Sequence, residues 1–309
     1  MKIAFFGTPD FAIPALRKIH NSNHNILATI TGVAKPSGRG QKLNKTPIYS
    51  ESENLAIPII EVNDLQDPTF ITKLKSLNVD IFIVVAFKIL PEKIFSIPKY
   101  GTVNLHASLL PKYRGSAPIH HAILNGDTKT GITTFQINNR VDAGSIYLQE
   151  EYIITNKATT GMVWDDLSVA GAGLLVKTLD GIENNSILPI KQDLQKSSPA
   201  PKLKSEMFCI DWNKSSVEIH NQIRAFSPNP GAFTKLNNSR IKLFESKLVD
   251  TNLFKPGEFE FINDIIIVGT GKGDLIIESV QLEGKRRMSI ADFYKGVINK
   301  IEGKVIIFG

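Results

Sequence analysis

Residues 79–87 read Val-Asp-Ile-Phe-Ile-Val-Val-Ala-Phe, and from Ile81 onward this segment is apolar without a break. A strand with one exposed face alternates apolar and polar residues, whereas a strand in the middle of a parallel sheet is covered on both faces and is apolar throughout. The segment therefore predicts the central strand of an α/β sheet. Open sheets of this kind bind ligands beyond the carboxyl ends of their strands, so the residues that follow become candidates for a site.

The start of the chain fits the same architecture. Lys2 to Phe6 is an apolar run that ends at Gly7, and apolar residues at helical spacing follow as far as Ile19. Strand, glycine turn and helix in this order predict the opening of a doubly wound, Rossmann-like α/β domain. A dinucleotide-binding turn would need two more glycines, where Asp10 and Ile13 stand. An NAD-dependent oxidoreductase is therefore disfavoured.

The pattern changes in the last third of the chain. Residues 217–226 predict a helix, and short alternating segments separated by turn residues follow at 232–236, 240–249, 258–262, 265–269 and 275–282. Strands at this spacing indicate a small antiparallel barrel. The polar stretch 186–205 contains three prolines and is typical of a linker. We therefore expect a catalytic domain over 1–185, a linker over 186–205 and a second domain over 206–309.

Composition excludes several classes of protein and indicates the compartment. Cys209 is the single cysteine, which excludes an internal disulfide and a cysteine-rich zinc site. No apolar run reaches the length of a membrane span, and Ile3 to Phe6 is too short for the apolar part of a signal peptide. The histidines do not stand at ligand spacing from an acid, so no metal site is expected. The cytosol is the compartment that we expect.

The excess of basic residues is mild, with 36 Lys and Arg against 30 Asp and Glu. Their clustering is more informative than their number. Lys35, Arg39, Lys42 and Lys45 share one predicted loop, 34–47, which contains two glycines and no acid, and the run 285–287 reads Lys-Arg-Arg. An isolated basic cluster is ordinarily a solvated surface. A mobile, exposed loop with unopposed positive charge would also suit closure over a polyanion.

The candidate catalytic groups are Asn104, His106 and Asp142. Residues 102–106 predict a strand, on which side chains two apart share a face, so the amide and the imidazole point the same way. An amide donor beside an imidazole acceptor is what acyl transfer needs. Asp142 follows the strand predicted at 131–138 and stands on a loop. From the residues alone, Asn104 and His106 could equally make the hydrogen bonds that complete a strand end, and Asp142 could form a turn.

Two motifs resolve this choice. Asn-x-His-x-Ser-Leu-Leu-Pro at 104–111 and Val-Asp-Ala-Gly at 141–144 resemble the signature of enzymes that use 10-formyltetrahydrofolate. Within that superfamily the chain is similar to the methionyl-tRNA formyltransferases almost from end to end. This likeness is carried by residues 5–12, 37–40, 210–212, 222–226, 228–232 and 282–288. Asn139 and Arg140 depart from the commoner pattern of the family, which has an acid and a glycine there.

The resemblance implies a fold, a reaction and site residues. The fold would be a Rossmann-like formyltransferase domain followed by an OB-like barrel that binds tRNA. A monomer would transfer the formyl group of 10-formyltetrahydrofolate to the amino group of methionyl initiator tRNA, using Asn104, His106 and Asp142. We expect the folate to bind against Phe87, Lys88, Ile89, Leu90, Ser108, Leu109, Leu110 and Pro111. We expect the tRNA to bind through Arg39, Lys42, Lys285, Arg286 and Arg287.

Other functions remain open at this point. A formyltransferase that acts on an amino sugar or a nucleotide precursor would share the three candidate catalytic residues. The long C-terminal part argues against the nucleotide precursor. The absence of a second catalytic domain and the motifs at 224–226 and 284–288 argue against the amino sugar. A non-catalytic RNA-binding protein would have no need of the three together. These possibilities are separated by measuring formyl transfer to charged initiator tRNA and to free amines, and by measuring whether RNA is bound without any formyl transfer.

Overall fold

The computed structural model describes all residues except 38–41, 237–238, 263, 297–305 and 309. The described chain forms two compact units. The first consists of residues 1–118, 130–153 and 164–201, and the second consists of residues 119–129, 154–163 and 202–309. The chain therefore enters the second unit twice before residue 202.

A mixed sheet of seven strands is the centre of the first unit, in the order β10-β9-β7-β6-β1-β2-β5. The strands are β1 (Lys2–Gly7), β2 (Asn25–Gly32), β5 (Ile59–Val62), β6 (Ile81–Val85), β7 (Thr102–His106), β9 (Lys129–Gln136) and β10 (Ile146–Ile153). Neighbours from β7 to β5 pair in parallel, and β9 runs antiparallel to β7. Every residue of β6 is buried. The predicted α/β sheet with a central apolar strand is confirmed.

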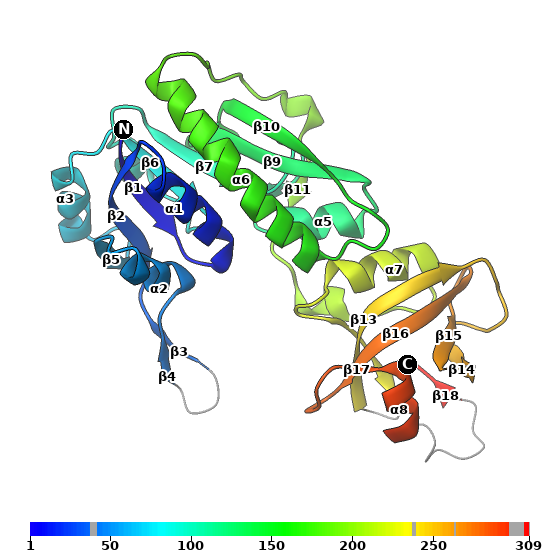
Figure 1. The fold of residues 1–309 in the computed structure, drawn as a ribbon. Coiled ribbons are helices and arrows are strands. Elements are labelled where there is room, and N and C mark those ends of the chain that lie inside the picture. Colours follow the sequence, from blue (N-terminus) through cyan, green and yellow to red (C-terminus); the bar gives the residue numbers. More distant parts are fainter. Residues whose placement is uncertain (38–41, 237–238, 263, 297–305, 309) are drawn as a thin grey trace. The chain divides into compact units, whose positions relative to one another are not determined.

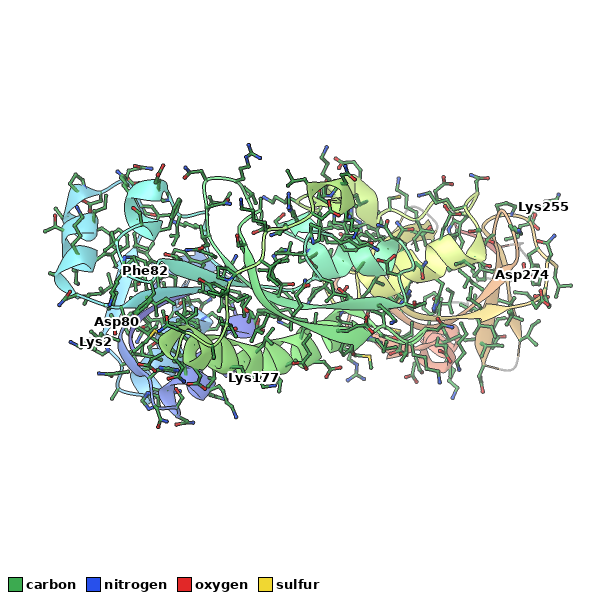
Figure 2. The ribbon with its side chains drawn as sticks, turned by 90° about the horizontal axis from the view of Figure 1, so that it is seen from above. Lys2, Asp80, Phe82, Lys177, Lys255 and Asp274 are labelled. Carbon is green, nitrogen blue, oxygen red and sulfur yellow. The ribbon has the colours of Figure 1, made fainter. Side chains whose placement is uncertain are left out.

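Helices cover both faces of this sheet (Figure 1). They are α1 (Ile13–His20), α2 (Pro47–Asn54), α3 (Pro68–Ser76), α4 (Glu92–Phe95) and α6 (Thr160–Glu183). Phe6, Phe82 and Val84 pack with residues of α3 and α4 in one core cluster. On the opposite face α6 lies against β7, because a Cβ on Gly171 would approach Leu105 to 2.7 Å. At the start of β6, the Asp80 carboxylate accepts a hydrogen bond of 2.6 Å from the Lys2 backbone N–H (Figure 2).

The predicted loop at 34–47 contains an element that the sequence did not indicate. Strands β3 (Lys35–Ser37) and β4 (Lys42–Asn44) pair as an antiparallel hairpin. The expectation of an irregular loop was therefore wrong for these six residues. The glycines 38 and 40 that suggested irregularity, together with Arg39, lie outside the described residues.

An antiparallel sheet dominates the second unit, in the order β12-β13-β16-β15-β14-β18, with β17 beside β16. The strands are β12 (Ala232–Leu236), β13 (Ser239–Val249), β14 (Glu258–Ile262), β15 (Ile265–Gly269), β16 (Asp274–Leu282), β17 (Met288–Ser289) and β18 (Ile306–Ile307). Helices α7 (Ser216–Ala225) and α8 (Ile290–Gly296) contribute Ile219, Ile223 and Phe293 to its core. The antiparallel C-terminal domain that we predicted is confirmed.

Helix α7 also anchors the segment 154–163 within the second unit. Arg224 donates hydrogen bonds to the carbonyl oxygens of Thr155 and Ala158, each at 3.3 Å. His220 donates through Nε2 to the carbonyl oxygen of Asn156 at 2.9 Å. The guanidinium is buried, so these bonds satisfy donors that would otherwise be costly to remove from water. The 222–226 motif, which the family resemblance singled out, has a structural role here.

Candidate active site

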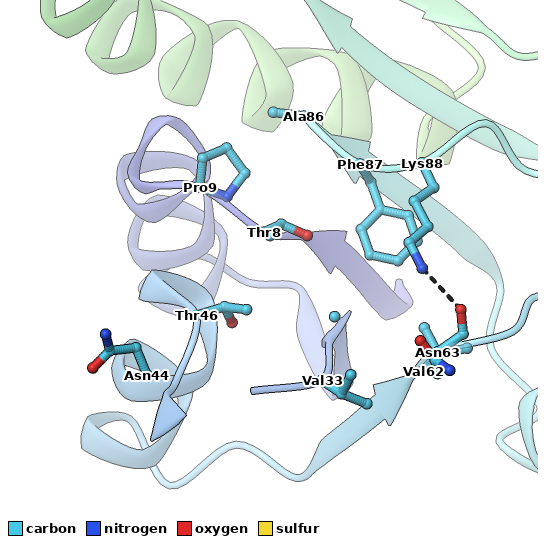
Figure 3. A pocket seen from close by; sticks show the side chains of 11 residues that line it. Thr8, Pro9, Val33, Asn44, Thr46, Val62, Asn63, Ala86, Phe87 and Lys88 are labelled. Atoms are coloured by element: carbon cyan, nitrogen blue, oxygen red, sulfur yellow. Dashed lines mark hydrogen bonds between the residues drawn. The ribbon is translucent and has the colours of Figure 1, made fainter. Parts of the chain in front are cut away.

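A cavity of about 480 Å³ opens at the carboxyl ends of four parallel strands (Figure 3). The lining residues end or directly follow β1, β2, β5 and β6, or come from the end of β4 and the segment between it and α2: Thr8, Pro9, Gly32, Val33, Asn44, Thr46, Val62, Asn63, Ala86, Phe87 and Lys88. The Phe87 ring packs edge-on against Phe6 at 5.5 Å, and Lys88 Nζ donates to the carbonyl oxygen of Asn63 at 2.9 Å. The turn after β6 is therefore held in place beside this cavity.

Asn104 and His106 lie on β7 and share a face, as the spacing predicted. Asn104 pairs in register with Val84 of β6, so its side chain is on the face of the sheet away from α6. Among the residues that the structure describes, the Asn104 carboxamide has no hydrogen-bond partner. Its side chain is half-buried, and its N–H groups are available to a bound oxygen.

The imidazole of His106 is oriented by the backbone of a neighbouring turn. Its Nε2 lies 2.9 Å from the carbonyl oxygen of Tyr113. A carbonyl oxygen can only accept, so Nε2 carries the proton in the neutral imidazole and the lone pair is on Nδ1. That atom lies 3.8 Å from Oδ2 of Asp142. Nδ1 is thus the atom of His106 that can accept a proton beside a carboxylate.

Asp142 reaches His106 by a loop that turns back. Strand β9 runs antiparallel to β7, with His106 opposite Thr133, so the chain leaves β9 going away from His106. The loop 137–145 must therefore return along β7. Asp142 adopts φ +50°, and Gly144 lies so close to the carbonyl oxygen of residue 136 that a Cβ has no room. These two backbone features allow the reversal.

The carboxylate of Asp142 is fixed in a largely buried position. Oδ2 accepts a hydrogen bond of 2.8 Å from the Gly115 backbone N–H, and the side chain is 12% exposed. The guanidinium of Arg114 is close enough for its charge to interact with Asp142. Burial lowers the pKa of Arg114, and the Asp142 charge partly opposes that lowering. A backbone donor thus binds the carboxylate, and a cation lies near it.

The expected folate residues are in different environments. Phe87 and Lys88 line the cavity, Ile89 is 75% exposed, and Leu90 is buried. In the second segment Ser108 and Leu110 are buried, while Leu109 and Pro111 are partly exposed. Ser108 Oγ donates to the carbonyl oxygen of Lys112 at 2.7 Å. A ligand can therefore meet the side chains of the first segment more readily than those of Ser108 and Leu110.

The residues that we expected to bind tRNA also differ from one another, in their exposure and in the ion pairs that they make. Arg39 lies outside the described residues, and Lys42 is on β4. Lys45 belongs to the same cluster, but its Nζ pairs with Glu53 at 2.7 Å, so the idea that all charges of this loop are unopposed was wrong. Lys285 and Arg286 are exposed. Arg287 instead pairs with Glu245 and lies over the Phe244 ring at 4.8 Å.

Sequence reasoning missed the backbone groups that hold the catalytic side chains. These are the Tyr113 carbonyl and the Gly115 N–H, both within the stretch that follows the 104–111 motif. No side-chain pattern reports a backbone contact. Over the described ranges there is no cluster of three metal-ligating side chains, and no helix there is long and apolar enough to cross a bilayer.

Comparison with known proteins agrees with this arrangement. Residues 1–179 match the family described as "Formyl transferase", and residues 202–297 match "Formyl transferase, C-terminal domain". The chain belongs to the formyl transferase family. Methionyl-tRNA formyltransferase of Alkaliphilus oremlandii is 41% identical over 305 residues, covering 98% of both chains. That of Fusobacterium nucleatum is 41% identical over 310 residues, covering 99% of this chain and 100% of the relative. Within the family, the chain is thus a member of the methionyl-tRNA formyltransferases.

Solved structures share the fold at lower identity. An N-formyltransferase of Helicobacter canadensis, in complex with folinic acid and dTDP-3-aminofucose, gives a TM-score of 0.69 at 23% identity and covers 93% of this chain and 100% of that one. Methionyl-tRNA formyltransferase of Clostridium thermocellum gives 0.56 at 19% identity, covering 82% of this chain and 96% of that one. At these identities the likeness establishes the fold.

Proposed function

We propose that this protein transfers the formyl group of 10-formyltetrahydrofolate to the α-amino group of methionyl initiator tRNA. The observation that carries the proposal is the convergence of three groups. A carboxamide with no partner among the described residues lies on the same strand face as an imidazole, whose Nδ1 lies 3.8 Å from a carboxylate oxygen. The near full-length relatives at 41% identity carry the name of this activity.

Each group has a distinct role in the transfer. When the amine attacks the formyl carbon, the formyl oxygen gains negative charge, and the Asn104 N–H groups donate to it. His106 Nδ1 accepts the proton that the amine loses. Asp142 stabilises the imidazolium that forms, because its carboxylate faces Nδ1. The bound folate supplies the activated formyl group. When the bond between the formyl carbon and N10 of the folate breaks, the proton that His106 accepted would pass to N10, so that tetrahydrofolate leaves.

The transfer is direct and forms no formyl-enzyme. A covalent route would need an activated nucleophile such as a thiolate. The sole cysteine, Cys209, belongs to the second unit and not to the unit that holds Asn104, His106 and Asp142. The attacking amine therefore meets the formyl carbon while the imidazole removes its proton.

The turn after β6 offers the kinds of contact that a folate needs. A pteridine needs apolar contact and a few backbone partners. Ile89 exposes a large apolar side chain, and Phe87 forms part of the cavity wall. From the 108–111 turn, backbone groups and the partly exposed Leu109 and Pro111 would complete the contact.

The tRNA is held by basic groups of both domains. Lys42 of β4 and Arg39, which lies outside the described residues, would contact the acceptor end, since a guanidinium binds phosphate through two donors. Lys285 and Arg286 of the C-terminal domain (206–309) would contact the stem, and Arg287 less so because it already has partners. The protein would act in the cytoplasm as a monomer.

Purified protein, 10-formyltetrahydrofolate and methionyl initiator tRNA test the proposal. We expect N-formylmethionyl-tRNA as the product, and no comparable rate with methionyl elongator tRNA or with a nucleotide-linked amino sugar. Formylation of the amino sugar at a higher kcat/KM than the tRNA would replace this function by the sugar-directed one. RNA binding without formyl transfer to any amine would make the protein a non-catalytic RNA-binding protein.

A further inference from the structure

Residues 190–200, here called the strap, follow α6 and run beside the catalytic groups of the first unit. The strap contains a short 3-10 helix (Leu194–Lys196) and strand β11 (Pro199–Ala200). From 188 to 197 every residue is exposed except Gln192. In an extended surface segment, a single residue that turns inward is held by particular contacts.

The strap is attached to both segments that carry the catalytic geometry. Ile190 pairs with Ile146 through two backbone hydrogen bonds of 2.8 Å, just after the loop 137–145. At its other end, β11 pairs in parallel with β8 (Arg114–Gly115). There Ser198 accepts from the Tyr113 N–H through Oγ and from the Arg114 N–H through its carbonyl, both at 2.9 Å.

Gln192 joins these segments through its side chain. Its Nε2 donates to the carbonyl oxygens of Asp142, at 2.9 Å, and Gly144, at 2.7 Å. Its Oε1 accepts from Arg114, at 2.6 Å from Nη2 and 3.2 Å from Nε. Carbonyls only accept and a guanidinium only donates, so the amide can take only this orientation. Both N–H groups and the oxygen are used.

We propose, on the basis of the proposed function, that Gln192 is a positioning residue for Asp142. Asp142 has a left-handed backbone, which needs support from its surroundings. Gln192 binds the backbone of residues 142 and 144 and holds the guanidinium of Arg114 nearby. It thereby keeps the Asp142 carboxylate facing His106 Nδ1. Gln192 touches neither reactant nor imidazole, so its effect passes through the loop.

The test compares Gln192→Ala and Gln192→Glu with Gln195→Ala, an exposed glutamine of the same strap. Gln192→Glu keeps an acceptor for Arg114 but loses both donors to the loop. We expect both Gln192 variants to lower kcat for formyl transfer by about 10- to 100-fold, with KM for tRNA and folate within about twofold, since misplacement of a catalytic group acts on the chemical step. Gln195→Ala should behave as the wild type.

Hydrogen exchange gives a readout that does not depend on activity. Amides of 137–145 and 113–115 should exchange faster in Gln192→Ala, while those of β1 and β6 stay protected, because the change is local. Unchanged exchange in the loop, or an unchanged kcat, would overturn the proposal. Faster exchange throughout the first unit would mean that Gln192 stabilises the unit as a whole, and that result would also overturn the proposal. If the wild type formylates no tRNA, the proposed function fails while loop exchange still tests this inference.

Discussion

His106 donates a hydrogen bond through Nε2 to the carbonyl oxygen of Tyr113, at 2.9 Å. This contact fixes the tautomer of the neutral imidazole and leaves Nδ1 as the basic atom. Nδ1 is also the atom nearest Asp142. The six residues between His106 and Tyr113 form a turn whose backbone thus defines which nitrogen can act, and Gly115, on β8 just after this turn, binds the carboxylate.

Replacing Asn104 tests the role of its amide. Asn104→Ala should lower kcat by about 10²- to 10³-fold, the usual effect of losing one donor to a developing oxyanion. The melting temperature should stay close to that of the wild type, because the carboxamide makes no hydrogen bond to the described part of the protein. Steady-state formylation and thermal unfolding measure the two effects. A variant with wild-type kcat would remove Asn104 from the mechanism.

Replacing Ile89 tests where the folate lies. Ile89→Asp should weaken folate binding by at least about tenfold, because it puts a charge against the apolar part of the ligand. Ile89 is 75% exposed, so the fold should tolerate the change. Val169→Asp on α6 is the matched control, since Val169 is 65% exposed and apolar as well. Equal folate affinity for both variants, measured by calorimetry, would move the folate away from this turn.

The strands and helices were predictable because their apolar patterns are local. Strands 102–106, 232–236, 258–262 and 265–269 have the predicted bounds. Strand β9 ends two residues earlier than expected, because the Ile137 N–H already bonds the carbonyl of Thr102 at the start of the return loop. The hairpin at 35–44 was missed because proline, glycine and lysine are poor strand residues there.

The basic run 285–287 is tested by salt dependence. Neutralising Lys285 and Arg286 together should weaken tRNA binding and reduce the slope of log K against log salt by about one for each phosphate that the protein no longer neutralises. Lys255→Ala, an exposed lysine before β14, is the control for general charge. An unchanged slope in the double variant would mean that these side chains face solvent. Arg287→Ala should instead lower the melting temperature, since Arg287 already binds Glu245 and Ser279.

Acid should destabilise the second unit through His120 of α5 (Pro118–Leu124). Burial, and secondarily the neighbouring His121, lowers the pKa of His120 from 6.5 to about 4. Between these values the unfolded chain binds the proton and the folded one does not, so stability is lost as pH falls from about 6.5 to 4. The loss is about 3 kcal/mol at most. His120→Gln should reduce this slope in urea unfolding, and His220, whose pKa burial also lowers, should keep the remaining part, whereas exposed His20→Gln should retain the full slope. A slope in His120→Gln equal to that of the wild type would contradict the assignment.

The catalytic side chains of the candidate site could be predicted from the sequence, but the groups that hold them in position could not. Asn104, His106 and Asp142 could be chosen because amide, imidazole and carboxylate carry chemistry wherever they stand. Gln192 gave no signal, since a glutamine in a polar, proline-containing stretch is typical of a linker. Its importance lies in hydrogen bonds that span 48 to 78 residues of chain. Only the folded backbone brings these groups together.

Single-turnover formylation of methionyl initiator tRNA, with enzyme in excess, tests the central claim most directly. The comparison is wild type against Asp142→Asn, which keeps an acceptor for the Gly115 N–H but removes the charge that faces His106. We predict N-formylmethionyl-tRNA from the wild type, and from Asp142→Asn a rate at least about 10²-fold lower, with unchanged affinity for tRNA and folate. An equal single-turnover rate for the two proteins would contradict the proposed role of Asp142, and absence of the product with the wild type would contradict the function itself.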